Sequence, residues 1–366
     1  MPSEPRIDRI DLHWGHVPVD LHFSYGHVQQ FAFTIFRLGA EGHEGVGEVL
    51  LQPESSWLKR IDDLVGLDPR RLDALLPADT TSDGDRIFQE GLSIALHDLV
   101  GQISGLPLHA LLGGKRRDQV PLMPCVFPTS AQDAGQAAEL FLGQGFKHLK
   151  VKLVGNLDED RARTEAIRAV APEDLVLQGD ANEGYETLDT ATQAVKALGD
   201  AGLDLFEDPL KGDVPSYRRL REACDGSRAK VMVDALARRT ADLVQVLRQN
   251  AADVINIHPD QPGSLSRVME HARIVQAFGV PVSIGGTGYT AVGTAAYQHL
   301  TSVVSAEGSC GELGGAFDHH MPQHLVTEQL LMKDGAVSIP DTPGLGVRLD
   351  TEALSRYEEG HRAWAG

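Results

Sequence analysis

From about residue 119 onward, the chain repeats one pattern of hydrophobic and polar positions every 24 to 28 residues. Each repeat is a short β-branched or aliphatic run, a loop, and then apolar residues at helical spacing. The apolar runs cover residues 120–126, 148–153, 175–177, 203–206, 231–233, 254–257 and 280–284. Helical patterns lie between them, for example over residues 159–170, 188–198 and 241–247. Strands that alternate with helices predict right-handed crossovers and a parallel sheet.

The number of repeats favours closure of this sheet. Seven units are visible, and we predict an eighth near residues 302–313. Eight such units predict an α/β fold of the (β/α)8 type, a modified TIM barrel. The alternative is an open, doubly wound sheet, but no dinucleotide-binding glycine pattern follows the first strand.

The two ends of the chain do not follow the repeating pattern of hydrophobic and polar residues. Residues 31–38 alternate as a strand does, residues 42–47 are rich in glycine, and residues 87–103 show helical spacing. The stretch 333–349 contains the glycines and prolines of turns between short strands. We therefore predict three parts: an N-terminal α+β domain over 1–118, the barrel over 119–328, and a C-terminal segment over 329–366 that returns to the N-terminal domain.

Composition narrows the range of partners. The 366 residues are 42% hydrophobic and 23% charged, which is typical of globular proteins. With 52 acidic and 33 basic side chains the formal charge is -19, which repels nucleic acid and anionic membranes. Three widely spaced cysteines and the lack of a signal sequence predict a cytoplasmic protein without disulfides. A small anionic substrate would need a site made locally positive by lysine, arginine or a bound cation.

Polar residues end five consecutive apolar runs. They are Lys152, Asp180, Glu207, Asp234 and His258, which follow one another at intervals of 28, 27, 27 and 24 residues. The carboxyl ends of parallel barrel strands meet at one mouth, so these side chains should converge there. A single strand-ending acid usually caps the next helix. Three acids in succession, between a lysine and a histidine, favour a site instead.

A divalent cation would resolve the repulsion among three converging carboxylates. Oxygen ligands from Asp180, Glu207 and Asp234, with no cysteine or histidine among them, suit Mg²⁺ before Mn²⁺. Asn182 lies two residues beyond Asp180 and is expected to hydrogen-bond a ligand or the substrate.

Three basic residues are candidates for proton transfer. Lys150 and Lys152 lie two apart on one strand and so face the same way. Each ammonium disfavours the other's charge, which predicts a lowered pKa and a neutral amine base near pH 7. His258 is a candidate acid or base from the other side of the mouth. The alternative is a structural histidine whose ring nitrogens are hydrogen-bonded in the core.

These motifs resemble those of the enolase superfamily, in its mandelate racemase and muconate lactonizing enzyme branches. The barrel motifs are Lys150-Val151-Lys152, Asp180-Ala181-Asn182, Glu207-Asp208-Pro209 and Asp234. Outside the barrel, the resemblance extends to Gly45-Val46-Gly47-Glu48, Leu111-Leu112-Gly113-Gly114 and Pro343-Gly344-Leu345-Gly346. It implies that the N-terminal domain and the C-terminal tail form a cap over the barrel.

The resemblance also implies a function. In this superfamily Mg²⁺ binds a substrate carboxylate and stabilises the enediolate formed when the α-proton is removed. By similarity Asp180, Glu207 and Asp234 hold the ion, Lys152 is an acid/base and Lys150 holds the substrate carboxylate. We also expect a homo-oligomer that acts on a small carboxylate.

Three functions follow from this pattern. The first is an isomerase that racemises, epimerises or cycloisomerises its substrate, with Lys152 and His258 on opposite faces of the α-carbon. The second is a dehydratase, a lyase acting on a hydroxy acid. The third is an inactive binding protein of the same fold. Two departures from the family pattern leave the subgroup open. His258 stands where the muconate lactonizing branch has Lys and the mandelate racemase branch has Asp. Ala235 follows Asp234 at a position where Glu is common in the family.

The segment 21–30 is a candidate for substrate specificity. Phe23, Tyr25 and His27 alternate and would share one face of an extended chain. By resemblance this segment is the loop of the cap that closes over the barrel mouth, with Tyr25 and His27 at the end of the substrate remote from Mg²⁺. The alternative is an ordinary surface loop or edge strand.

Overall fold

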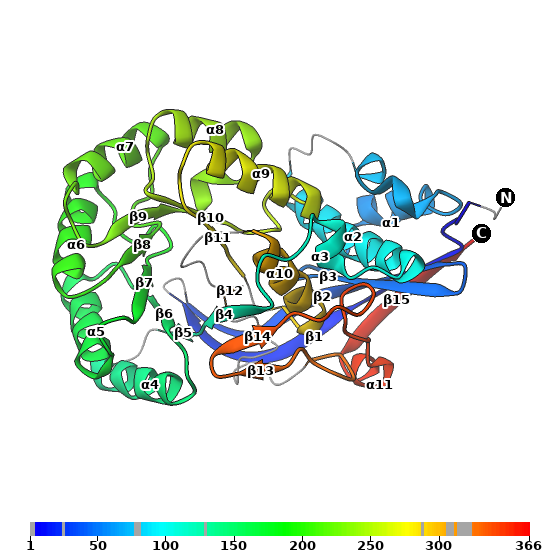
Figure 1. Ribbon diagram of the computed structural model, residues 1–366, viewed down its shortest axis with the longest axis horizontal. Helices are drawn as coiled ribbons and strands as arrows, with labels where there is room; N and C mark the ends of the chain where they lie inside the picture. The colour runs from blue at the N-terminus through cyan, green and yellow to red at the C-terminus, as the bar shows by residue number, and fades with distance from the viewer. Residues whose placement is uncertain are drawn as a thin grey trace.

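The barrel predicted from the repeats is present in the computed structural model, which describes residues 4–23, 26–76, 82–127, 130–286, 289–304, 311–312 and 324–366. Its strands are β4 (Gln119–Met123), β5 (Cys125–Val126), β6 (His148–Lys152), β7 (Val176–Asp180), β8 (Leu205–Glu207), β9 (Lys230–Val233), β10 (Val254–Ile257), β11 (Val282–Ile284) and β12 (Gly311–Glu312). From β5 to β12 each strand pairs in parallel with the next, and β12 pairs with β4. Since β4 and β5 form one strand interrupted at Pro124, the sheet closes (Figure 1).

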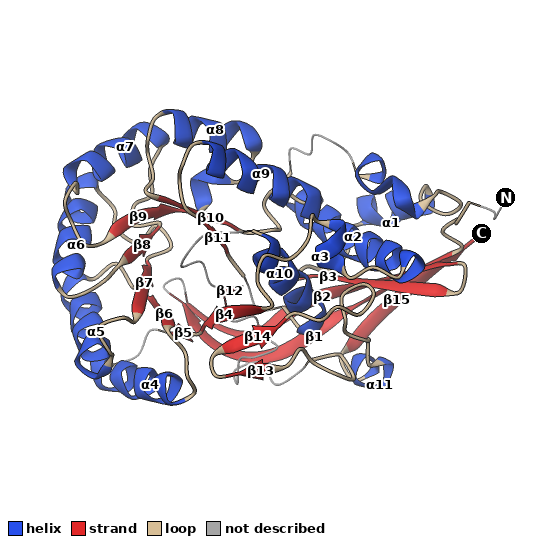
Figure 2. Ribbon diagram, viewed as in Figure 1, coloured by secondary structure: helices blue, strands red, loops and turns tan. Residues whose placement is uncertain are grey.

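Helices follow the strands and surround them (Figure 2). They are α4 (Ala131–Gly143), α5 (Leu157–Val170), α6 (Leu188–Asp200), α7 (Val214–Ala223), α8 (Thr240–Arg248), α9 (Leu265–Ala277) and α10 (Ala291–Val303), with a 3-10 turn, η2 (Ala235–Ala237), after β9. Side chains at Ser130, Asn156 and Ser264 accept backbone N–H bonds and start α4, α5 and α9. The predicted eighth strand near 302–313 is β12, while residues 302–303 end α10.

The cap is a four-stranded antiparallel sheet covered by helices. Its strand order is β15 (Glu358–Ala365), β1 (Arg9–Phe23), β2 (Gly26–Ala40) and β3 (His43–Val49). Around it lie α1 (Ser55–Asp62), η1 (Pro69–Leu75), α2 (Asp83–Ser104) and α3 (Leu108–Leu111). A Cβ at Gly45 would lie 2.4 Å from the Ala95 carbonyl oxygen, and one at Gly47 2.1 Å from that of Gly91. The Gly-Val-Gly motif therefore lets α2 approach β3 closely.

The C-terminal segment joins both parts of the molecule. The hairpin of β13 (Met332–Lys333) and β14 (Ala336–Ser338) pairs with β4 of the barrel. After α11 (Thr351–Ser355), β15 pairs with β1 of the cap. Buried Asp98 of α2 accepts the N–H groups of Val46 and Leu345, both at 2.8 Å, and so ties this segment to the cap. The boundaries at 118 and 328 stay predictions.

Glu48 connects the cap to the barrel. Its carboxylate is fully buried and accepts the Thr290 N–H and hydroxyl, both at 2.7 Å, and the Gly293 N–H at 2.8 Å. These donors belong to the first turn of α10, so an acid from the cap caps a barrel helix. The cap is thereby fixed beside the end of β11.

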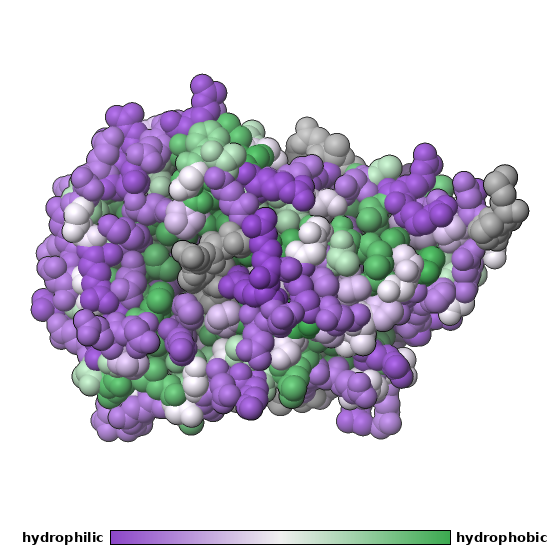
Figure 3. Space-filling model, viewed as in Figure 1, coloured by the Kyte–Doolittle hydropathy of each residue, from purple (hydrophilic) through white to green (hydrophobic). Residues whose placement is uncertain are grey.

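The outer surface agrees with the composition. The face shown in Figure 3 is largely hydrophilic. Within the described ranges, none of the helices has the length and apolar character needed to cross a membrane.

His299 makes the folded state sensitive to acid. It is fully buried on α10, where its Nδ1 accepts the His109 N–H at 3.3 Å and its Nε2 lies 3.1 Å from the Leu345 carbonyl oxygen. Burial lowers the pKa of His299 from 6.5 to about 4. Between these values the unfolded chain binds the extra proton, so the stability contributed by neutral His299 is lost as pH falls.

We therefore predict that His299→Gln flattens the dependence of unfolding free energy on pH. Between about pH 7 and pH 5 the wild-type chain should lose roughly 2 kcal/mol more than the variant. Urea unfolding at several pH values measures this difference. His43→Gln, at an exposed histidine, is the control and should keep the wild-type slope. Identical slopes for His299→Gln and wild type would show that His299 does not titrate in this way.

Candidate active site

Lys150 lies between two carboxylates at the mouth of the barrel. Its side chain is buried, and its Nζ is 2.7 Å from Glu207 Oε2 and 3.1 Å from Asp180 Oδ2. The register of β6, β7 and β8 places these residues on three adjacent strands. A cation therefore already bridges two of the predicted metal ligands.

Lys152 contacts the same carboxylate from the next position on β6. Its Nζ is 2.5 Å from Asp180 Oδ2 and 3.2 Å from Asn182 Oδ1. Asn182 also donates its backbone N–H to Asp180 Oδ1 at 2.9 Å. The structure thus brings Lys150, Lys152, Asp180 and Asn182 into one cluster.

The prediction that the neighbouring ammonium groups lower a lysine pKa is wrong for Lys152. Burial lowers the pKa of Lys152, and Lys150 lowers it further, but the negative charges of Asp180, Cys125 and Glu207 together raise it above the ordinary value. In turn, burial would raise the pKa of Asp180, but the two ammonium groups hold it well below its usual range. The sequence spacing revealed the lysine pair, but not the carboxylate that both lysines share.

Glu207 is held by two amide side chains. Gln178 Nε2 donates to Oε2 and Asn256 Nδ2 donates to Oε1, each at 2.7 Å. Both amides are buried, and Asn256 Oδ1 has no hydrogen-bond partner among the described residues. A buried neutral oxygen beside a buried carboxylate is thus left unsatisfied near the centre of the mouth.

Asp234 is held through both its side chain and its backbone. Gln261 Nε2 lies 2.5 Å from Oδ1. Behind it, fully buried Asp208 accepts the N–H groups of Asp234 and Ala235, each at 3.0 Å. Burial raises the pKa of Asp208 well above its ordinary value, and the charges of Asp234 and Glu207 add to this. Burial also raises the pKa of Asp234.

His258 lies between two acids at the end of β10. Its Nε2 is 4.0 Å from Asp234 Oδ2, and its Nδ1 is 3.6 Å from Asp260 Oδ1. Asp260 Oδ1 is buried, and the part of the chain that the structure describes offers it no hydrogen-bond partner. A Cβ at Gly285 would come within 2.3 Å of the imidazole, so that glycine makes room for the ring.

The donor chemistry of this mouth fits a hard cation. The described residues contain no ready-made group of three acidic, histidine or cysteine side chains at metal-binding distance. Asp180 and Glu207 are instead joined through the Lys150 ammonium, and the unsatisfied Asn256 oxygen lies beside them. Carboxylate and amide oxygens that already share a positive charge are ligands of the kind Mg²⁺ takes.

Several site residues were missed from the sequence. Gln178 and Asn256 each lie two residues before a predicted site residue, Asp180 and His258, and so face the same side of their strands. That alternation was a usable signal. Gln261 reaches Asp234 from a loop, where no periodicity predicts the direction of a side chain.

The proposed lid is only partly described by the structure. Tyr25 is outside the described residues. His27 is exposed on β2, and its Nε2 is 2.7 Å from Asp20 Oδ1. The roles of Tyr25 and His27 in substrate binding stay predictions.

Comparisons with known proteins agree on one family. Residues 9–113 match the model of the mandelate racemase / muconate lactonizing enzyme N-terminal domain, and residues 132–353 match the enolase C-terminal domain-like model. The L-Ala-D/L-Glu epimerase of Bacillus subtilis is 30% identical over 273 residues, which are 72% of this chain and 71% of that protein.

Solved structures show the same fold. Muconate lactonizing enzyme from Pseudomonas fluorescens, complexed with muconolactone, aligns with a TM-score of 0.89 at 23% identity, over 98% of this chain and 100% of that one. A dipeptide epimerase from Enterococcus faecalis, complexed with Mg and a dipeptide, aligns with a TM-score of 0.84 at 23% identity, over 94% and 99% of the two chains.

The charge balance around Lys150 can be tested through stability. We predict that Lys150→Met, measured with a chelator present, loses about 3 kcal/mol or more of unfolding free energy, because buried Glu207 then loses its ammonium partner and Asp180 keeps only Lys152. Added Mg²⁺ should restore more stability to this variant than to wild type, since the lysine no longer competes for the same oxygens. Denaturant unfolding measures both effects.

Lys196→Met is the matched control, because Lys196 is exposed on α6. It should change stability by less than about 0.5 kcal/mol and leave the Mg²⁺ effect unaltered. If Lys150→Met were as stable as this control without metal, Lys150 would not be the compensating charge of the cluster.

Proposed function

The chain belongs to the mandelate racemase / muconate lactonizing enzyme family of the enolase superfamily, and from that premise we propose what its site does. It is an isomerase that removes the proton α to the carboxylate of a small carboxylic acid, giving an enediolate. Reprotonation or ring closure then yields a racemised, epimerised or cycloisomerised product. The observation that supports this most is the buried cluster of Lys150 and Lys152 with Asp180 and Glu207.

Asp180, Glu207 and Asp234 are the residues that would hold Mg²⁺. When bound, the ion would supply positive charge for the substrate carboxylate and its enediolate, and would offset the carboxylate charge that raises the pKa of Lys152. Gln178, Asn256 and Gln261 orient these ligands through the hydrogen bonds described above.

The two lysines have different proposed roles, one in substrate binding and the other in proton transfer. Lys150 is fixed by two carboxylates and is placed to hold the anionic end of the substrate. Lys152 is less buried, with a side chain 13% exposed against 5% for Lys150. The amine closer to solvent is the better candidate to take the α-proton and return it.

His258 is the proposed acid/base on the other face of the α-carbon. Its Nδ1 faces Asp260 Oδ1 at 3.6 Å, so the carboxylate favours the tautomer that carries its proton on Nδ1 and leaves Nε2 for chemistry. Because Nε2 faces Asp234, the ring is directed toward the mouth.

The same geometry admits a second reaction. In a dehydratase, His258 would donate a proton to the departing hydroxide of a hydroxy acid after Lys152 removes the α-proton. The inactive binding protein is disfavoured, because both lysines and all three predicted ligands are present, and each has its own hydrogen-bond or ion-pair partners at the mouth. A cytoplasmic location and a homo-oligomeric state stay predictions from the sequence.

The two-base assignment predicts a pair of complementary defects. Lys152→Ala and His258→Asn should each lower racemisation by roughly 10²-fold or more, since each lacks one proton-transfer group. Each variant should still exchange the α-proton of one enantiomer with heavy water, and the two should act on opposite enantiomers. Proton NMR of the separate enantiomers measures this.

His43→Asn, at an exposed histidine, should behave as wild type. Full racemisation by His258→Asn would contradict the two-base assignment and leave Lys152 as the one base, which is the arrangement of a dehydration or a cyclisation.

A further inference from the structure

A second cavity lies at the end of the barrel opposite the proposed site. Arg273 and Gln276 border it from the last turns of α9, Val304 from the end of α10, and Arg116 from the segment that leads into β4. Since the helices run antiparallel to the strands, all of these positions belong to the amino ends of the strands. The lysines and acids of the proposed site lie at the carboxyl ends.

The cavity is positively charged within an acidic protein. None of the described residues that line it is acidic. Some exposed helical arginines elsewhere on the chain pair with an acid one turn away, as Arg161 does with Glu165 and Arg218 with Glu222. Neither Arg116 nor Arg273 takes part in an ion pair within the described part of the chain. Two guanidinium groups therefore face the same space, and no carboxylate among the described residues pairs with either of them.

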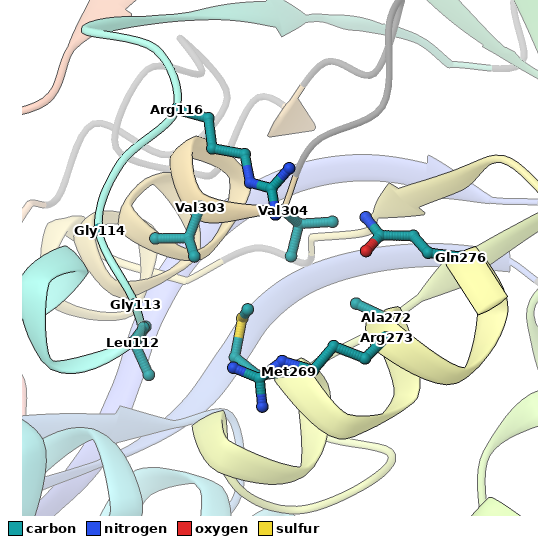
Figure 4. Close-up of a pocket in the computed structure, with 10 residues that line it drawn as sticks. All are labelled: Leu112, Gly113, Gly114, Arg116, Met269, Ala272, Arg273, Gln276, Val303 and Val304. Carbon is teal, nitrogen blue, oxygen red and sulfur yellow. The ribbon is translucent and has the colours of Figure 1, made fainter.

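The shape of the cavity suits a small ligand with an apolar part. Its floor includes Met269 and Val304, which are buried. Figure 4 shows Arg116, Arg273 and Gln276 around this floor, with Arg273 and Gln276 on α9 and Arg116 on the segment that leads into β4. The cavity has a volume of about 80 Å³. One water molecule takes roughly 10–15 Å³ of such space, so there is room for a phosphate group or a short carboxylate.

The arginines are carried on fixed backbone. The Arg116 N–H donates to the Ser302 carbonyl oxygen of α10 at 2.8 Å, and Arg273 lies within the regular helix α9. Gly113 and Gly114 form part of the wall with φ of 114° and 93°, and no atom lies within 4 Å of a Cβ built at either. The glycine pair thus keeps that side of the cavity open.

We propose that this cavity binds a small organic anion through a carboxylate or phosphate group. The planar guanidinium groups of Arg116 and Arg273 match both kinds of oxyanion. The hydrocarbon part of the ligand would lie on Met269 and Val304. This site is separate from the proposed active site and does not depend on the proposed reaction.

The test uses the full chain and two probes, inorganic phosphate and succinate, titrated calorimetrically at low ionic strength. The double variant Arg116→Gln/Arg273→Gln should bind at least one probe roughly tenfold or more weakly than wild type. Loss of phosphate binding alone would assign a phosphate ligand, and loss of succinate binding alone a carboxylate. Loss of both would assign a site that accepts either oxyanion.

The matched control is Arg71→Gln/Arg248→Gln, which removes two exposed arginines that also lack ion pairs in the described chain. It should bind both probes as wild type does, and anion binding at the active-site lysines should be equal in all three proteins. Thermal unfolding checks that the variants are folded. Equal affinity of the cavity variant and the control, or no binding of either probe by wild type, would overturn the proposal.

Discussion

The candidate site depends on the balance of charge among carboxylates that are removed from water. Asp180, Glu207 and Asp208 are almost fully buried, and Asp234 lies beside them. Two ammonium groups, Lys150 and Lys152, compensate the first two acids through direct contacts. The pKa of Asp234 and that of Asp208 are raised, because burial penalises their charge and, within the described residues, no lysine pairs with either. The mouth of the barrel is therefore short of positive charge, which is the condition that favours a divalent cation.

The barrel fold brings residues from successive sequence repeats together in this cluster. Parallel strands in register bring Lys152, Asp180 and Glu207 side by side, although they are far apart in the chain. The backbone then fixes the less regular members, since Asp208 holds the N–H groups after β9 and Gly285 makes room for His258. Glu48 anchors the cap on α10, so the two parts of the molecule meet beside the mouth.

Much of this arrangement was predictable from the sequence, for a physical reason. In a barrel all strands end at the same edge, so spacing along the chain is a guide to position in space. The five strand-ending residues could therefore be predicted to converge at one mouth. The Gly45 and Gly47 motif likewise reflects a local requirement, the close approach of α2. What spacing does not encode is the partner of a charged group. The two lysines were expected to lower each other's pKa, but Asp180 reverses that effect for Lys152. The contacts of Asp260 and Gln261 depend on the path of a loop, and the pairing of β14 with β4 depends on a long-range return of the chain.

The central claim is that this mouth activates the proton next to a carboxylate with the help of a divalent cation. The most direct measurement is α-proton exchange in heavy water, followed by NMR across a library of small carboxylates, first with Mg²⁺ and then with excess chelator. The account predicts exchange in at least one carboxylate, its loss in chelator, and its return when Mg²⁺ is restored. A substrate that is turned over at the full rate in chelator, with no solvent hydrogen entering at its α-carbon, would contradict it.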